Sequence, residues 1–288
     1  MSNSRFIAFL ELARPWWLVV LLPVFFSSAL LANKELVLSC SFLYALASYI
    51  FLKSAVSALN DYFDRDVDEI IHPKRAIPSK RVTPKCVLIY AGILTVIALI
   101  LSLFVNWIFL ILEAIVVFCT ILHFSRGKRI DFIPGISNIF TSVLLAFTPL
   151  VGWAAVSNLT YIAVLLFFII FFYDLSHDTA SSIRDLKGDS HGEVKTVAVG
   201  FGVKTSSALC LLFFTFSYLI SLILYFLTAL DLLYLIMISI GFILCFCSIL
   251  VLIKKPSVKI SKNTHILISL YPIILSFGII FDILINLT

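Results

Sequence analysis

The sequence predicts an all-α protein whose helices cross a membrane about nine times. Hydrophobic residues form 61% of its 288 residues and charged residues 13%, with a mean hydropathy of +1.12, which lies outside the range of ordinary soluble domains. Apolar runs of about 17 to 25 residues, long enough to span a bilayer as a helix, recur along the chain. Basic residues gather in alternate connections between these runs, as is typical of a polytopic membrane protein.

The apolar runs define the order of the predicted spans. We expect the helices to form one bundle around a central cavity, as a single domain over residues 1–288. No small-residue cleavage pattern accompanies the first run, so the first span should remain in the mature chain. The predicted spans are residues 16–33, 38–60, 86–105, 107–124, 136–156, 161–181, 206–227, 230–253 and 265–286.

The distribution of Lys and Arg predicts the orientation. Of 21 such residues, two precede the first span, six lie in residues 65–85, three in 126–129, four in 184–204 and four in 254–262. These connections all lie on one side of the membrane, which the positive-inside rule assigns to the cytoplasm. The protein is therefore expected in the cell membrane, with its N-terminus cytoplasmic. The net charge of +5 follows from this asymmetry and favours anionic lipid headgroups, and nothing indicates a nucleic-acid partner.

The six cysteines are read as small apolar residues. They lie almost entirely inside spans and show neither a CxxC pattern nor Cys/His spacing, so the sequence indicates neither a disulfide framework nor a zinc site. These residues are Cys40, Cys86, Cys119, Cys210, Cys245 and Cys247.

The acidic residues need a different explanation, because the positive-inside rule is indifferent to Asp and Glu. Ten of the sixteen lie at the cytoplasmic ends of the second and sixth spans. If the second span continues as a helix, Asn60, Asp64 and Asp68 stay within an arc of about 80°, and Asp61 joins its edge. In the second segment, the four aspartates at positions 174, 178, 185 and 189 fall within about 60°.

Stacked carboxylates at the edge of the hydrocarbon repel one another and lose hydration, so a compensating cation is expected. Mg²⁺ prefers oxygen ligands and is typically held by one or two carboxylates together with substrate phosphates. The alternative is a solvated loop whose acids pair with neighbouring bases. Two regularly spaced stripes on the same membrane side favour the metal. The candidate metal ligands are Asn60, Asp61, Asp64, Asp68, Asp178, Asp185 and Asp189.

Basic residues beside the stripes could bind a diphosphate leaving group, whose oxygens gain charge as the bond to carbon breaks. Lys74, Arg75 and Arg81 follow the first stripe, and Lys128 lies at the cytoplasmic end of the fourth span, four residues beyond its apolar run. Each base could also serve only membrane topology. Lys53 lies two turns before Asn60 on the same helix face, and an intramembrane lysine suggests a cavity role, with snorkelling as the alternative.

These motifs resemble the UbiA superfamily of intramembrane prenyltransferases. The first signature of that family, NDxxDxxxD, stands here at residues 60–68, and the DxxxxxxDxxxD form of the second stands at 178–189. The tract at 74–81 is similar to the family's KxRPxPSGR. Its YxxxK motif appears as Phe124 and Lys128.

The resemblance implies a polyprenyl diphosphate donor, held through Mg²⁺ by the two motifs, and an electron-rich acceptor that attacks the allylic carbocation. Asp64, Asp68, Asp185 and Asp189 would carry the catalytic role. Lys74, Arg75, Arg81 and Lys128 would hold the diphosphate, and Lys53 and Asn60 would contact the acceptor. The prenyl tail would lie in a lipid-facing groove among the spans.

The acceptor is the least determined feature. An aromatic acceptor of a quinone-type pathway, similar to hydroxybenzoate or naphthoate, is the first choice, and a glycerol-phosphate lipid or a chlorophyllide-like acceptor is the alternative. The archaeal lipid enzymes usually carry KDIxDxxGD and RPxN, where this chain has residues 181–185 as SSIRD and residues 14–17 as RPWW. A non-enzymatic alternative is an ion-coupled transporter, although transporter ion sites usually lie nearer the midplane of the membrane.

Overall fold

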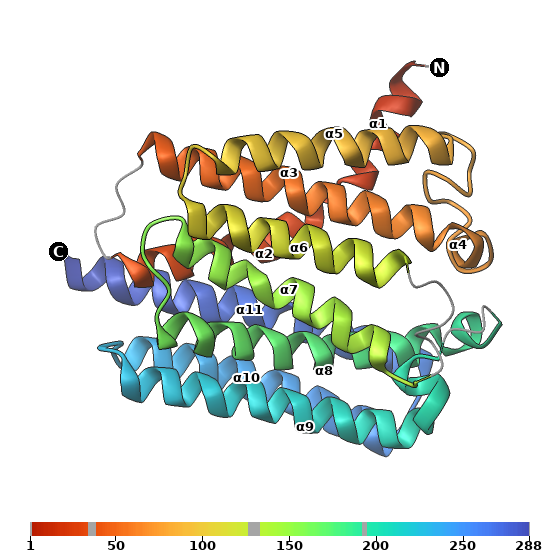
Figure 1. Cartoon of the computed structure of the whole chain (residues 1–288). Coiled ribbons are helices and arrows are strands. Elements are labelled where there is room, and N and C mark those ends of the chain that lie inside the picture. Colours follow the sequence, from red (N-terminus) through yellow and green to blue (C-terminus); the bar gives the residue numbers. More distant parts are fainter. Residues whose placement is uncertain (1, 34–38, 126–132, 192–194, 288) are drawn as a thin grey trace. The chain divides into compact units, whose positions relative to one another are not determined.

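The computed structural model describes residues 2–33, 39–125, 133–191 and 195–287, and these residues form helices and connections without a strand (Figure 1). The helices are α1 (Ser2–Leu12), α2 (Pro15–Ala32), α3 (Cys40–Phe63), α4 (Arg65–Ile71), α5 (Pro84–Ser102), α6 (Trp107–Ser125), α7 (Ile136–Ala154), α8 (Tyr161–His191), α9 (Val197–Leu227), α10 (Leu232–Lys254) and α11 (Val258–Leu287). Within the described ranges, eight segments are long and apolar enough to cross a membrane, and Trp107–His123 is a shorter apolar helix. The predicted all-α membrane fold is confirmed.

Three helices are longer than their predicted spans. α8 runs on to His191, α9 begins at Val197 and α11 at Val258, whereas the apolar windows end at 181 and begin at 206 and 265. In α8 and α11 the hydropathy window stops where polar residues begin, while the helical backbone continues through them. Gly202 bends α9, since its φ of 76° lies in the left-handed region that glycine adopts without a Cβ clash.

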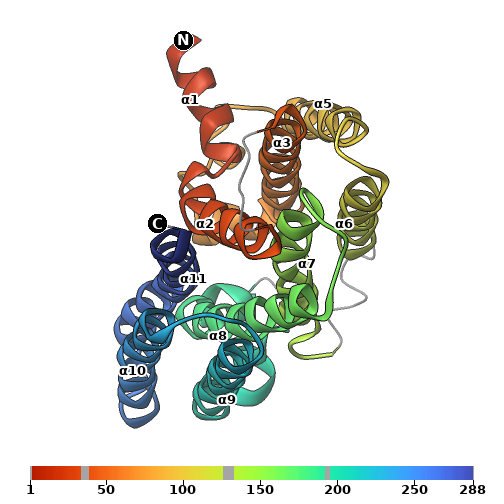
Figure 2. The same ribbon diagram turned by 90° about the vertical axis from the view of Figure 1, so that its left-hand side faces the viewer.

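The helices group into two compact units, each described by itself. The first unit contains α1, residues 15–19 of α2, and α3 to α6. In this unit α3 packs on both α5 and α6 (Figures 1 and 2). The second unit contains residues 20–32 of α2 and α7 to α11. Here α8 packs on α7, α9 and α11, and α10 packs on α9 and α11.

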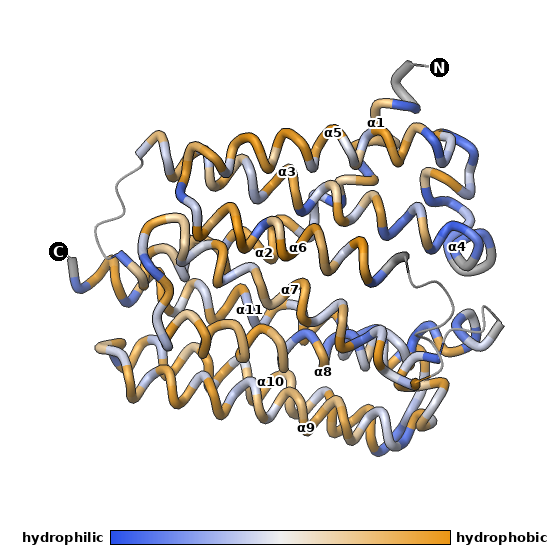
Figure 3. Tube along the Cα trace, viewed as in Figure 1, coloured by the Kyte–Doolittle hydropathy of each residue, from blue (hydrophilic) through white to orange (hydrophobic). Residues whose placement is uncertain are grey.

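A small hydrophobic core in the first unit fixes the basic loop between α4 and α5. Ala76, Ile77 and Val82 of this loop are buried. They belong to one cluster with Ala8 and Leu12 of α1 and with apolar residues of α3 and α5. Figure 3 shows α4 and this loop as a hydrophilic end of the unit, so the buried side chains anchor a segment that is otherwise polar. The neighbouring bases are thereby held in place.

Glu113 of α6 is fully buried in the first unit. The Ser48 hydroxyl oxygen lies 2.5 Å from Glu113 Oε2 and 2.7 Å from the Ala98 carbonyl oxygen, which joins α6 to α3 and α5. The Ser48 hydroxyl has one hydrogen and can donate to only one of these two oxygens. If it donates to the Ala98 carbonyl oxygen, the neutral acid form of Glu113 can donate its own proton to the Ser48 oxygen. A neutral Glu113 also avoids the cost of a charge inside a membrane.

Glu113→Gln is therefore expected to preserve stability, because its amide supplies a donor and removes no volume. Glu113→Ala removes the hydrogen bond to the Ser48 oxygen and leaves a void, and should lower the free energy of unfolding by about 1–3 kcal/mol. The thermal unfolding midpoints of both variants in detergent would test this. Equal destabilisation by Gln and Ala would contradict it.

Candidate active site

The first acidic motif lies at a bend between two helices. α3 ends at Phe63, and Asp64, with φ −82° and ψ 0°, separates it from α4. The expectation of an uninterrupted helix through Asp68 is therefore wrong at Asp64. Backbone hydrogen bonds still run from Asp64 N to Asn60 O (2.9 Å) and from Asp68 N to Asp64 O (2.8 Å), so the spacing of four residues is preserved across the bend.

The side chains of the first motif contact one another and two arginines. Asn60 Nδ2 donates to Asp64 Oδ2 at 2.7 Å. Arg75 Nη1 lies 2.6 Å from Asp68 Oδ2 and 3.6 Å from Asp61 Oδ1. Arg14 forms a further ion pair with Asp61. Asp61 and Asp68 are buried and Asp64 is partly buried, so the carboxylates lie in a setting with little water to solvate them.

Burial makes this motif electrostatically costly. It raises the pKa of Asp64 to about 7, an effect to which the charge of Asp68 adds and which Arg14 and Arg75 oppose. Burial also raises the pKa of Asp68, although Arg75 partly offsets this. The motif therefore favours a further cation, and its carboxylate and amide oxygens are ligands that Mg²⁺ prefers.

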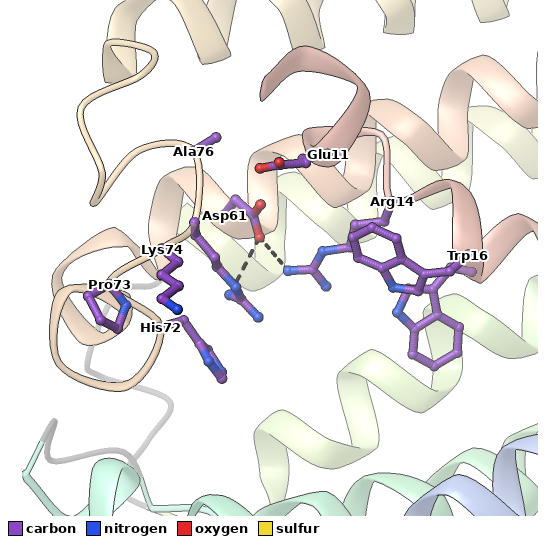
Figure 4. A pocket seen from close by; sticks show the side chains of 10 residues that line it. Glu11, Arg14, Trp16, Asp61, His72, Pro73, Lys74 and Ala76 are labelled. Carbon is purple, nitrogen blue, oxygen red and sulfur yellow. Dashed lines mark hydrogen bonds and ion pairs between the residues drawn. The ribbon is translucent and has the colours of Figure 1, made fainter. Parts of the chain in front are cut away.

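A cavity of about 720 Å³ opens beside this motif in the first unit (Figure 4). Its described lining comes from α1, the start of α2, Asp61 of α3 and the basic loop. The residues are Glu11, Arg14, Trp16, Trp17, Asp61, His72, Pro73, Lys74, Arg75 and Ala76. Two predicted diphosphate ligands, Lys74 and Arg75, line this cavity, and their role remains a prediction.

The other predicted bases have different positions. Arg81 donates to both carboxylate oxygens of Glu11, with Nη1 to Oε1 at 2.8 Å, and also to the Lys74 carbonyl oxygen at 2.8 Å. It ties α1 to the basic loop and is absent from the described pocket lining. Lys53 is partly buried on α3 and is likewise not among the lining residues described. Lys128 lies outside the described residues.

The second acidic motif lies on one continuous helix, as predicted, because α8 extends through Asp178, Asp185 and Asp189. Asp178 Oδ2 accepts hydrogen bonds from Asn138 Nδ2 (2.8 Å) and Thr141 Oγ1 (3.0 Å), both on α7. Asp185 pairs with the adjacent Arg184 at 2.5 Å. Asp189 Oδ2 accepts from Thr196 Oγ1 at 3.1 Å.

Asn138 connects the second motif to the first residue of α9. Its Oδ1 accepts from Val197 N at 3.3 Å while its amide donates to Asp178. Gly200 of α9 allows this helix to lie close to Pro134, which precedes α7. A Cβ atom at position 200 would lie 2.1 Å from Pro134 Cβ. Sequence reasoning missed Asn138, Thr141 and Arg14, because a polar residue within an apolar run and a base before a span both have ordinary structural explanations.

Neither motif by itself forms a complete metal cage. Among the described residues, no group of three or more His, Cys, Asp or Glu side chains is arranged to hold an ion. The seven predicted ligands are divided between the two units, with Asn60, Asp61, Asp64 and Asp68 in the first. Each motif by itself is compatible with Mg²⁺, which commonly takes only one or two carboxylates and completes its shell with water and phosphate oxygens.

The fold and the two motifs define an all-helical membrane protein with aspartate clusters at the ends of two long helices. The UbiA prenyltransferase family model matches residues 20–271, which cover most of the chain and both units. The chain belongs to the UbiA prenyltransferase family, and the predicted family resemblance is confirmed.

Several relatives carry the name digeranylgeranylglyceryl phosphate synthase. The relative from Natronomonas pharaonis is 29% identical over 166 residues, and the one from Haloquadratum walsbyi is 28% identical over 179 residues. The chain spans 59% and 62% of the lengths of these two proteins, which is less than two thirds. The relative from Methanococcus aeolicus is 28% identical over 254 residues, covering 84% of this chain and 88% of its own length.

Solved structures show the same fold. A structure described as digeranylgeranylglyceryl phosphate synthase in membranes has a TM-score of 0.76 at 22% identity, covering 97% of this chain and 98% of its own. A UbiA homologue from Archaeoglobus fulgidus bound to GPP and Mg²⁺ has a TM-score of 0.67 at 14% identity, covering 95% and 99%.

Proposed function

We propose that this protein is an intramembrane prenyltransferase that transfers a polyprenyl group from its diphosphate to the free hydroxyl of a glycerol-phosphate lipid. The match to the Methanococcus aeolicus digeranylgeranylglyceryl phosphate synthase, over most of both chains, carries this proposal. The name of that relative implies a product with two prenyl groups on glyceryl phosphate. The relatives favour this acceptor over the aromatic acceptor that the sequence suggested first.

The oxygen-rich donor sets of the two motifs fit a divalent cation. In the first unit, Asn60, Asp64 and Asp68 would hold such a cation. In the second unit, the corresponding ligands would be Asp178, Asp185 and Asp189. When bound, Mg²⁺ neutralises charge on the diphosphate as the carbon–oxygen bond breaks. The Archaeoglobus fulgidus homologue, which was solved with GPP and Mg²⁺, supports such a donor and metal.

The remaining chemistry is assigned to protein side chains and to the apolar spans. Arg75 would contact the diphosphate, which leaves with the electron pair of the broken bond. The acceptor hydroxyl oxygen forms the new bond to the prenyl carbon and loses its proton to the released diphosphate. The apolar helices would line a groove for the prenyl tail and exclude water from the allylic cation. We place this reaction at the cytoplasmic face, following the distribution of basic residues.

The acceptor can be tested with purified protein in nanodiscs containing Mg²⁺ and geranylgeranyl diphosphate. We expect diphosphate release and a mass-identified product with geranylgeranylglyceryl phosphate, at least about a hundredfold faster than with 4-hydroxybenzoate or a dihydroxynaphthoate. The reason is that a site built to hydrogen-bond a phosphate group and to hold a prenyl chain discriminates strongly against aromatic acids, which lack both.

Transfer to an aromatic acid, but not to the lipid, would refute the proposed acceptor. Absence of transfer from any prenyl diphosphate to any member of this panel would refute the proposed activity. Protein without added acceptor serves as the control for simple hydrolysis of the donor.

A further inference from the structure

Arg14 occupies a defined position between α1 and α2. Its φ of 47° lies in the left-handed region, which is uncommon for a residue with a Cβ. Backbone hydrogen bonds fix the turn on both sides, from Arg14 N to Glu11 O (3.0 Å) and from Trp17 N to Arg14 O (2.9 Å). The guanidinium points to Asp61 within the cavity (Figure 4). This backbone arrangement therefore presents a cation to the cavity from the start of a membrane helix.

More basic than acidic side chains line the cavity. Arg14, Lys74 and Arg75 line it together with His72, against the carboxylates of Glu11 and Asp61. Arg81, outside the described lining, already engages Glu11. Arg75 in turn pairs with Asp68, which is also outside the described lining, so Asp61 is the lining carboxylate that remains to balance Arg14 and Lys74. An anionic group entering this space would meet side chains suited to charge-assisted hydrogen bonds.

The cavity is also amphiphilic. His72 and Lys74 lie on one side of it and Trp16 on the other, with Arg14 and Asp61 between them (Figure 4). Trp16 and Trp17 begin α2, which continues as an apolar helix. A ligand with an anionic head and an apolar body would place the head against the bases and the body along the indole rings. The volume of about 720 Å³ is within the range of small-molecule sites.

The contacts of Asp61 divide the arginines into two positions. Its Oδ1 atom pairs with Arg14 and lies 3.6 Å from Arg75 Nη1. Arg75 also contacts Asp68, one of the carboxylates assigned above to the donor's metal and diphosphate. Arg14 instead lies beside the tryptophans that begin α2. Both arginines therefore contact one carboxylate oxygen, but Arg75 is also held by the first acidic motif, whereas Arg14 has no contact with that motif beyond Asp61 among those described. The planar guanidinium of Arg14 suits a phosphomonoester.

The geometry points to a specific subsite: Arg14 and Lys74 bind the phosphate headgroup of the acceptor lipid, and Trp16 and Trp17 contact its apolar part. This inference rests on the proposed function, because it assigns the second substrate of that reaction. The same chemistry would also suit the donor diphosphate. Arg14 would then be a donor ligand, and the two sources must be separated by experiment.

Steady-state kinetics of the full chain in nanodiscs separates them. For Arg14→Gln we expect the KM for geranylgeranylglyceryl phosphate to rise about 10- to 100-fold, as for loss of a charge-assisted contact. The KM for geranylgeranyl diphosphate should change by less than about twofold, and kcat should be largely retained. Lys74→Gln should shift the same KM in the same direction. Because Lys74 is exposed, this second variant tests the subsite without disturbing the Asp61 ion pair.

Arg65→Gln is the matched control. Arg65 contacts Asp66 and the Tyr62 carbonyl oxygen and is absent from the described pocket lining. The substitution removes the same positive charge from the same unit, but outside the cavity, so the KM values for the donor and the acceptor should both remain unchanged. A rise in the donor KM for Arg14→Gln and Lys74→Gln, with the acceptor KM unchanged, would overturn the assignment, and so would no change in either.

A binding measurement provides a readout that does not depend on turnover. Titration of metal-free and donor-free protein with geranylgeranylglyceryl phosphate should change the tryptophan fluorescence of the wild type and of Arg65→Gln. The change should require about tenfold or more ligand in Lys74→Gln. Equal titration curves for wild type and Lys74→Gln would overturn the subsite. Binding without any prenyl transfer would instead refute the proposed reaction and leave the phosphate subsite supported.

Discussion

Asp64→Asn is expected to lower kcat for prenyl transfer by at least about a hundredfold while leaving the protein folded. Preorganised electrostatic groups at a reacting centre are typically worth about 10²–10³ in rate. Asn keeps the shape of Asp and can still accept the hydrogen bond from Asn60, so the bend between α3 and α4 should persist. The change removes one charge from a buried cluster in which burial raises the pKa of Asp64. The structure describes no ion pair of Asp64, so folding of the metal-free protein should not depend on its charge.

Asp66→Asn is the matched control for this prediction. Asp66 lies two residues away on α4, is 83% exposed, and lies 3.6 Å from Arg65. Exposed ion pairs of this kind contribute little, so transfer should remain within about twofold of the wild type. Turnover, thermal midpoint and Mg²⁺ dependence would be measured in parallel. Full activity in Asp64→Asn would exclude Asp64 from the reaction, and equal losses in both variants would indicate a general effect of charge.

Removal of divalent metal is expected to have an effect of similar size. Chelation with EDTA should reduce transfer by at least about a hundredfold, because the donor's diphosphate would then meet the motif carboxylates without a neutralising cation. Added Mg²⁺ in excess of the chelator should restore the rate. Turnover and the thermal unfolding midpoint would be followed through the cycle, and the midpoint should show that the helices remain folded.

The control for chelation is KCl added to the same ionic strength as the Mg²⁺, which should restore nothing. If Mg²⁺ acted only by screening surface charges, KCl at the same ionic strength would restore the rate as well. Undiminished transfer in EDTA, after exhaustive removal of bound metal, would contradict a metal-dependent site. Recovery with KCl alone would have the same consequence.

Local properties of the chain were predictable because they depend on residues close in sequence. Apolar runs longer than the hydrocarbon core predicted the spans, and the four-residue spacing of Asn60, Asp64 and Asp68 placed them on one side of their segment. The bend at Asp64 was not predicted, since the same helical spacing survives a short break. The extension of α8 also escaped the hydropathy windows, although it confirms the continuous helix assumed for the second motif.

The sequence by itself determined the membrane class, the helix order and the two acidic motifs, because these depend on composition and on helical periodicity. Tertiary structure decided which side chains meet them. Arg14 reaches Asp61 across 47 positions, Asn138 reaches Asp178 across 40, and Arg81 reaches Glu11 across 70. Such contacts depend on which helix faces pack together, and no local pattern encodes them. Packing therefore places Arg14 in the cavity and pairs Arg81 with Glu11 of α1. Both residues carry the same charge, so the sequence alone did not show which of them lines the cavity.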